Sequence, residues 1–129
     1  MATGFPAVTG DVMTSGMFNG LVAFTLNAQT GTTYTAVLTD QYQVLVTMNN
    51  ASANTFKIPT NASVAFPVGT VITVLTIGAG TCTISAVTSG TTTVLSAGAT
   101  AASPTVTQYK SAACIKTATD TWYVVGAIA

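Results

Sequence analysis

The sequence contains no histidine, arginine or glutamate, and it has only three lysines and three aspartates among 129 residues. Charged residues make up 5% of the chain and the net charge is zero, whereas soluble monomers usually carry about a quarter of their residues as charge. No charged residue lies between Lys57 and Lys110. Because little electrostatic repulsion keeps copies apart, the composition indicates a surface largely covered by lipid, by other copies or by partners. It argues against a free-standing enzyme.

The chain also lacks the apolar run that a membrane helix requires, which is roughly 18 residues or more. Its most apolar stretch, Val64–Ile77, is interrupted by Pro67, Gly69 and three threonines. The first residues carry neither a basic segment nor an apolar core, so no secretory signal is predicted. We therefore expect no membrane partner and synthesis in the cytoplasm.

The shortage of titratable side chains limits the catalysis that is available. General acid–base chemistry near neutral pH favours histidine, or a tuned glutamate or lysine. Asp40 and Asp120 lie at expected turns, where aspartate accepts backbone N–H bonds. We predict no catalytic residue and no enzyme. A hydrolase would need paired carboxylates drawn from Asp11, Asp40 and Asp120.

The two cysteines, Cys82 and Cys114, lie inside strand-like runs, and their spacing matches no zinc motif. Buried free thiols are expected in a reducing cytosol, with a late disulfide as the alternative. No cofactor and no metal site is predicted. The aspartates together with backbone carbonyls leave the binding of a hard cation open.

Two classes of ligand differ in how well the composition suits them. Three lysines and no arginine neutralise few phosphates, so nucleic acid is not an expected partner. A host-surface glycan stays open, because aromatic side chains stack on sugar rings, and the competing interpretation places the aromatics in the core or in an interface. The aromatic candidates are Tyr34, Tyr42, Tyr109, Trp122 and Tyr123.

Alanine, valine, isoleucine and threonine are abundant, and β-branched residues favour strands over helices. Strand-like runs recur about every ten residues, which is typical of a sandwich or barrel. We predict an all-β fold with one domain at residues 29–129, a single antiparallel β-sandwich or barrel-like domain of about eight short strands. The expected strands are Tyr34–Thr39, Val44–Met48, Asn54–Ile58, Val64–Phe66, Val71–Ile77, Cys82–Val87, Thr91–Leu95, Thr107–Lys116 and Trp122–Ile128.

Strand edges in this domain lack their usual protection. Exposed edges are normally guarded by lysine, other charges or proline, and none of these occurs between Val71 and Leu95. The strands of this region are therefore either central in their sheets or covered by neighbouring subunits. The second possibility predicts a homo-oligomer.

Residues 1–28 differ from the rest, because they are rich in glycine and carry large apolar side chains outside strand-like runs. We predict an irregular N-terminal arm that ends in a possible strand, Leu21–Leu26. In this arm Phe5, Met13, Met17 and Phe18 are expected to anchor the protein to a neighbouring subunit or a larger assembly. The alternative is that these side chains fold back onto the domain's own core.

An ordered series of short motifs runs through the β-domain and resembles a small β-domain found in many virion proteins of tailed bacteriophages, of the capsid decoration, head fibre and tail fibre types. The resemblance covers roughly residues 29–128. The motifs are Thr33–Asp40, Val46–Asn50, Asn54–Pro59, Phe66–Thr70, Gly78-Ala79-Gly80, Ile115-Lys116 and Thr121–Gly126.

This resemblance implies a structural virion protein, a trimer, with no catalytic residues to carry over. A long fibre would need an extended shaft, and residues 1–28 are too short to supply one. We therefore expect a capsid decoration or cement protein that binds the major capsid protein or other virion proteins. The alternative is a short head- or tail-fibre knob that recognises a host-surface receptor or glycan.

Overall fold

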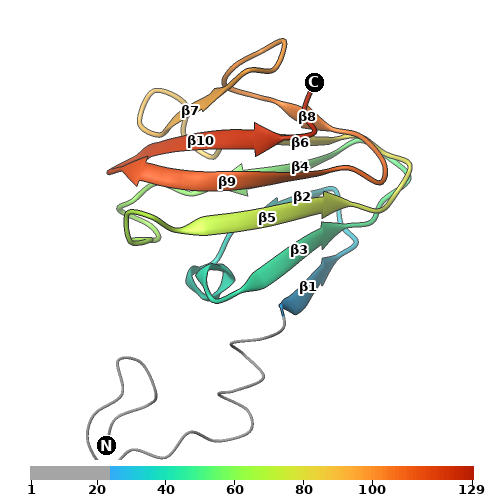
Figure 1. Ribbon diagram of the computed structural model, residues 1–129, viewed down its shortest axis with the longest axis horizontal. Coiled ribbons are helices and arrows are strands. Elements are labelled where there is room, and N and C mark those ends of the chain that lie inside the picture. The colour runs from blue at the N-terminus through green and yellow to red at the C-terminus, as the bar shows by residue number, and fades with distance from the viewer. Residues whose placement is uncertain (1–23) are drawn as a thin grey trace, which may run out of the picture.

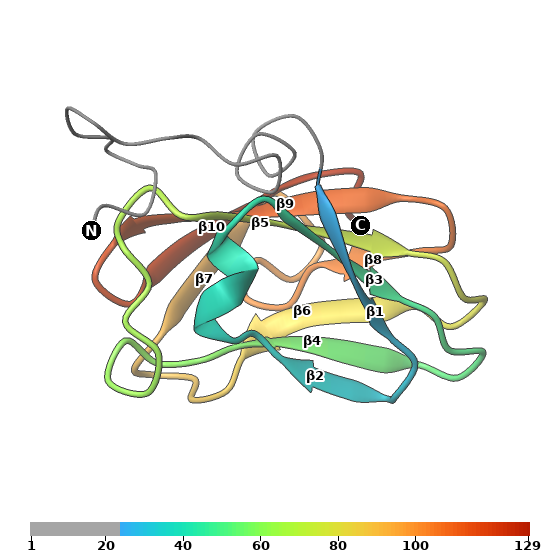
Figure 2. The same ribbon diagram turned by 90° about the horizontal axis from the view of Figure 1, so that it is seen from below.

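The computed structural model describes residues 24–129. Over this range the chain forms two stacked β-sheets and one short 3-10 helix (Figures 1 and 2). The predicted all-β class is therefore confirmed. The predicted anchor residues Phe5, Met13, Met17 and Phe18, together with Asp11, lie outside the described residues.

Ten strands make up the two sheets, in place of the eight or so expected. The 3-10 helix η1 (Leu38–Gln41) follows β2. The six-stranded sheet has the order β1 (Thr25–Gln29), β3 (Val44–Met48), β5 (Val71–Thr76), β9 (Ser111–Ala118), β10 (Thr121–Gly126) and β7 (Thr93–Ser96). The four-stranded sheet has the order β2 (Thr33–Thr35), β4 (Asn54–Ile58), β6 (Cys82–Ala86) and β8 (Thr105–Val106).

The predicted antiparallel pairing is wrong for most of the fold. From β1 to β8 the chain changes sheet after every strand, and among the first six strands the successive strands of one sheet run in the same direction. β1, β3 and β5 pair in parallel, and so do β2, β4 and β6. Antiparallel pairs occur where β9 meets β5 and β10, and where β8 meets β6. The first six strands thus form three stacked coils, each with one strand in either sheet (Figure 2).

The turns of successive coils lie directly on one another. Gly80 donates its backbone N–H to the carbonyl of Asn50, and Asn50 in turn donates its side-chain amide to the carbonyl of Thr30. A Cβ added at Gly80 would lie 1.9 Å from the carbonyl oxygen of Ser52, and one at Gly78 would lie 2.3 Å from the nitrogen of Asn50. Glycine is required here because the backbones of adjacent turns touch.

The hydrophobic core lies between the two sheets. It is formed by every second residue of the strands, because alternate side chains of a strand point to opposite faces. Val46, Ile72, Val74 and Cys114 reach it from the six-stranded sheet, and Phe56, Ile58, Cys82, Ile84 and Val106 from the four-stranded sheet. Trp122 is 1% exposed and packs edge-to-face against Phe66 at a ring-centroid distance of 5.5 Å.

Four local expectations differ from the structure. The run predicted as Thr107–Lys116 forms no strand at residues 107–110, and β9 begins only at Ser111. The run predicted as Tyr34–Thr39 leaves the strand after Thr35, because the backbone turns into η1. Val64–Phe66 forms no strand, and Pro67 follows it directly. β1 overlaps the possible strand predicted at Leu21–Leu26, but it runs from Thr25 to Gln29 and so crosses the predicted boundary between the arm and the domain at residue 28.

Among the described strands, the unguarded ones are mainly central. β5 lies between β3 and β9, and β6 lies between β4 and β8, whereas β7 is an edge strand. The absence of guarding charges from Val71 to Ala86 is therefore explained by pairing within the chain.

Candidate functional site

Asp40 is a buried carboxylate at the open edge between the two sheets. Tyr34 donates its hydroxyl to Oδ2 at 2.6 Å, and the backbone N–H of Val37 donates to the same oxygen at 3.0 Å. Oδ1 accepts the side-chain amide of Asn27 at 2.9 Å. Since Asn27 belongs to β1 and Tyr34 to β2, this carboxylate ties the edge strands of the two sheets together.

Tyr34 is held in its neutral form by this arrangement. Burial, and after it the hydrogen bond to the Asp40 carboxylate, raises the pKa of Tyr34 to about 12. A phenolate at this place would lose its hydration and would face a second negative charge. The pair therefore acts as a structural latch, as the sequence analysis predicted for Asp40.

A second polar network fixes the loops near the start of β5 and the end of β9. Lys116 is buried and donates its Nζ to Asn61 Oδ1 at 2.5 Å and to the carbonyl of Phe66 at 2.7 Å. Asp120 Oδ1 accepts the backbone N–H of Asn61 at 2.7 Å and the hydroxyl of Thr92 at 3.1 Å. Asp120 also has a positive φ of 55°, which suits a turn aspartate. Both charged groups are thus used to fix loops.

Cys82 and Cys114 are free and buried, as predicted. Burial raises the pKa of Cys82 to about 11 and the pKa of Cys114 to about 12, the latter with a smaller contribution from Cys82. One thiol comes from each sheet. Such thiols are poor nucleophiles because the thiolate is disfavoured.

Residues 24–129 contain neither a cluster of metal-ligating side chains nor a helix that could span a membrane. Over this range, no three His, Cys, Asp or Glu side chains gather where they could hold a metal ion. Within the same range, no helix is long and apolar enough to cross a membrane.

The aromatic residues named as glycan candidates do not gather in one place. Trp122 is in the core, and Tyr34 is engaged with Asp40. Tyr109 is 78% exposed and lies beside the end of β5, whereas Tyr42 is 66% exposed and lies before the start of β3. Because β3 and β5 are parallel, these two tyrosines lie at opposite ends of the sheet.

The outer face of the six-stranded sheet carries no charged residue among residues 24–129, and its two central rows are mainly apolar. In one row across the strands, Leu26 lies beside Leu45, followed by Thr73, Ala113 and Val125. A second row contains Val71, Ile115, Tyr123 and Leu95. We call this surface the apolar face and define it as Leu26, Leu45, Val71, Thr73, Leu75, Leu95, Ala113, Ile115, Tyr123 and Val125.

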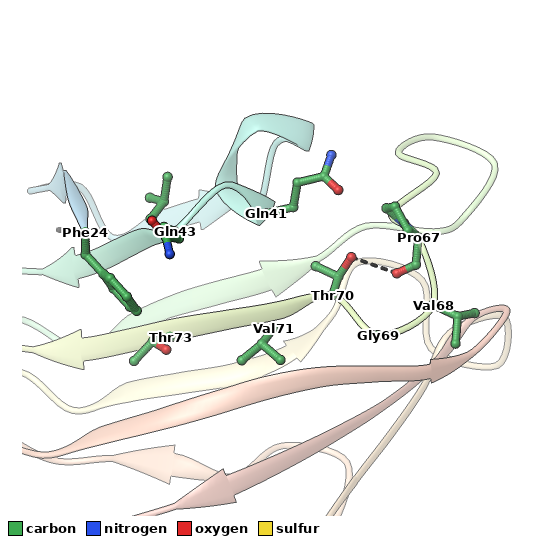
Figure 3. Close-up of a pocket in the computed structure, with 10 residues that line it drawn as sticks. Phe24, Gln41, Gln43, Pro67, Val68, Gly69, Thr70, Val71 and Thr73 are labelled. Carbon is green, nitrogen blue, oxygen red and sulfur yellow. Dashed lines mark hydrogen bonds between the residues drawn. The ribbon is translucent and has the colours of Figure 1, made fainter. Parts of the chain in front are cut away.

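An open hollow of about 470 Å³ lies at one end of this surface. Phe24 and Val68 lie on either side of it, with Val71 and Thr73 of β5 between them (Figure 3). Thr70 shapes the loop by donating its hydroxyl to the carbonyl of Pro67 at 2.7 Å. The hollow extends the apolar face beyond the ends of the strands.

The outer face of the four-stranded sheet carries hydroxyl groups. Thr33, Thr55, Thr83 and Thr105 lie side by side in register across all four strands. In the neighbouring row, Lys57 donates its Nζ to the hydroxyl of Ser85 at 3.2 Å. We call this surface the hydroxyl face and define it as Thr33, Thr35, Thr55, Lys57, Thr83, Ser85 and Thr105.

A hollow of about 660 Å³ borders the hydroxyl face and contains Lys57 and Ser85. Residues of β7 and of the loops around it form its other walls, and within residues 24–129 no aromatic side chain lines it. It therefore offers a cation and hydroxyls to a ligand but no surface for ring stacking.

The sequence analysis did not identify the apolar face. A signal was present, because β5 reads Val71-Ile72-Thr73-Val74-Leu75, which is apolar on both sides of the strand. Such a run is typical of a strand that is covered on both faces. We interpreted it only as an unguarded edge.

Comparisons of this chain with protein-family models, with curated proteins and with solved structures find no match. The functional interpretation therefore rests on the residues and contacts described above.

Proposed function

We propose that this chain is a structural virion protein of a tailed bacteriophage, a capsid decoration or cement protein that binds and stabilises the shell. The apolar face is the observation that carries this proposal. Leu26 is 65% exposed, and Val71, Tyr123 and Val125 are between 43% and 49% exposed. An apolar sheet face without charge is typical of a surface that another protein covers.

The energetics of such a surface suit a protein that works through contact. Burying one large apolar side chain contributes about 1.5–3 kcal/mol, and repeated copies on a symmetric shell multiply weak contacts through avidity. Many copies together can therefore stabilise a shell without chemical reaction.

The titratable groups of the described residues support the same role. Asp40, Asp120 and Lys116 are each engaged in two or more hydrogen bonds within the chain. Their partners are loop backbone and neighbouring side chains, so their charges stabilise the fold. The motif series of the β-domain, which resembles phage virion proteins, supports the placement on a phage particle.

The test is the composition of purified particles. Phage particles released from source cells are banded on a density gradient, and their proteins are quantified by mass spectrometry. We expect this chain in the particle band, in copy numbers comparable to those of the major shell protein. Absence from the band contradicts the proposal, and a few copies per particle favour a fibre.

The second candidate is a head- or tail-fibre knob that recognises a host glycan, and the observation that favours it is the exposure of Tyr109. Tyr109 adopts a positive φ of 65°, a conformation rare for aromatic residues, which holds the ring outside the sheet. Binding of purified protein to host cells, compared with the Tyr109→Ala and Tyr42→Ala variants, tests this candidate. Binding that only Tyr109→Ala abolishes supports it, and no binding by the unaltered protein contradicts it.

A further inference from the structure

We infer that the apolar face is the contact surface for a second copy of this chain. The inference extends the proposed structural role by naming the partner that covers this face. Other occupants, such as residues 1–23 of the same chain or a shell protein, are outcomes that the experiment below separates.

The first argument is the alternation of side chains. A sheet with one face in water normally places polar residues on that face, and the hydroxyl face follows this rule with threonine, serine and lysine. On the other sheet the outward positions are Val71, Thr73 and Leu75 on β5 and Thr121, Tyr123 and Val125 on β10, and four of these six are large apolar residues. This sheet has the composition of a layer packed on both sides.

The second argument is charge. The three lysines and the two described aspartates all lie elsewhere, in loops, in the interior or on the hydroxyl face. A partner with a charged surface would gain no ion pair here and would have to desolvate its own charges. An identical apolar face carries no such cost, so two copies are electrostatically compatible on this surface.

The third argument is size. Six strands spaced about 4.8 Å apart and about five residues long give a flat footprint of roughly 500 Å², and the accessible area over protruding side chains is larger. Each partner in a stable complex contributes about 800 Å². Two such faces can pack as the sheets of a sandwich do, about 10 Å apart. The flat footprint is therefore below one partner's usual share, and side chains that protrude from it, such as Leu26 and Tyr123, must supply the rest of the contact area.

The experiment measures the mass of the full chain in solution by sedimentation and light scattering over a range of concentrations. The variants are Tyr123→Lys on β10, one strand inside one edge of the sheet, and Leu26→Lys on β1 at the other edge. Thr33→Lys is the matched control, because it places the same charge on an exposed residue of an edge strand on the hydroxyl face. Far-UV circular dichroism checks that each variant is folded.

We expect the unaltered chain and Thr33→Lys to form the same oligomer. In Tyr123→Lys and Leu26→Lys the dissociation constant should rise roughly tenfold or more, because an ammonium group would be buried without a partner. Leu26 is well exposed in the single chain, so Leu26→Lys remains informative if Tyr123→Lys does not fold.

Two results overturn the inference. A monomer at all concentrations means that no second copy covers the face, which leaves residues 1–23 or a shell protein as the occupant. If the chain forms an oligomer whose dissociation constant is unchanged in both Tyr123→Lys and Leu26→Lys, the contact between copies lies on another surface. Since no particle is present, either result leaves the proposed virion role to its own test.

Discussion

The outer faces of the two sheets are built on similar backbones and carry opposite side chains. Outward positions of β4 and β6 are Thr55, Lys57, Thr83 and Ser85, whereas those of β5 are Val71, Thr73 and Leu75. Both faces are aligned by the same stacked coils, so the contrast does not come from the fold. It comes from which residue the sequence places at each outward position.

The contrast teaches how a chain with almost no charge divides its surface. Hydroxyl groups are satisfied by water, so the hydroxyl face needs no partner. The apolar face keeps large side chains in water until another surface covers them. Three of the four predictions that follow concern the free energy of unfolding of the fold that carries the two faces, and the fourth changes the hydroxyl face itself.

The largest expected effect comes from a substitution that disrupts the stacking of successive coils, which aligns the strands under both faces. Gly80→Ala places a Cβ against the backbone of the neighbouring turn, 1.9 Å from Ser52 O. Backbone cannot move aside as a side chain can, so we expect a loss of about 3 kcal/mol or more in the free energy of unfolding. Denaturant unfolding measures it.

Gly31→Ala is the matched control, because the nearest atom to its added Cβ is 3.9 Å away. We expect it to change the free energy of unfolding by less than about 1 kcal/mol. Equal effects of the two substitutions would contradict close stacking of the turns.

The next largest effect is expected from removing the hydrogen bonds of Asp40 that join β1 of one sheet to β2 of the other. Asp40→Ala removes the acceptor of Tyr34, Asn27 and the Val37 N–H. Leaving buried donors without an acceptor costs roughly 1–3 kcal/mol, and thermal unfolding measures the loss. Thr39→Ala in the same helix, at an exposed position, is the control. A stability equal to that of the control would show that the latch contributes nothing.

Alkaline pH should lower the stability of the folded protein through three partly or fully buried groups: Tyr34, Cys82 and Cys114. The pKa of Tyr34 rises from 10.0 to about 12, and those of Cys82 and Cys114 rise from 9.0 to about 11 and about 12. A group whose pKa is raised by folding contributes stability below its unfolded pKa, and this stability is lost as pH rises through the folded pKa. We therefore expect stability to fall from about pH 9 to about pH 12.

Unfolding curves at a series of pH values measure this decline. Tyr34→Phe should make the decline between about pH 10 and about pH 12 smaller, because phenylalanine does not ionise, and the contribution of the two cysteines should remain. A thiol reagent at neutral pH should react with the cysteines only after denaturant is added. Rapid reaction of the native protein would contradict their burial.

The smallest effect on stability is expected from substitutions that make the hydroxyl face as apolar as the apolar face. The triple variant Thr33→Val, Thr55→Val and Thr83→Val replaces hydroxyls of the hydroxyl face by methyl groups of similar shape. Exposed substitutions of this kind change the free energy of unfolding by about 0.5 kcal/mol or less each. The variant should instead associate through its second face, which sedimentation detects. An unchanged mass would mean that apolarity alone does not drive contact.

The sequence predicted most strands well, and the reason is local. The bounds of β3 and β4 are as expected, and β5 and β6 differ by one residue at their ends. In these segments β-branched residues lie between asparagine, proline and glycine turn signals, so propensity and pattern agree. Where they disagreed, as at Tyr34–Thr39, hydrogen bonds to Asp40 produced η1 in place of a longer strand.

The candidate site was less accessible to sequence reasoning. Alternation of apolar and polar residues identifies which strands are half-buried, but it does not tell which sheet each strand joins. Parallel and antiparallel pairing share the same period of two. The rows of the apolar face join β1, β3, β5, β9 and β10, which are far apart in the chain.

The sequence by itself determined that this protein is all-β, nearly uncharged and poor in catalytic groups, because composition and local pattern act through short-range preferences. Only the tertiary structure decided that the strands alternate between two sheets and that the apolar residues collect on one outer face. Such an arrangement depends on contacts between distant segments, such as the turn at Gly78–Gly80 against Asn50 and Ser52. The fold places these segments together because backbone stacking and core burial are satisfied jointly.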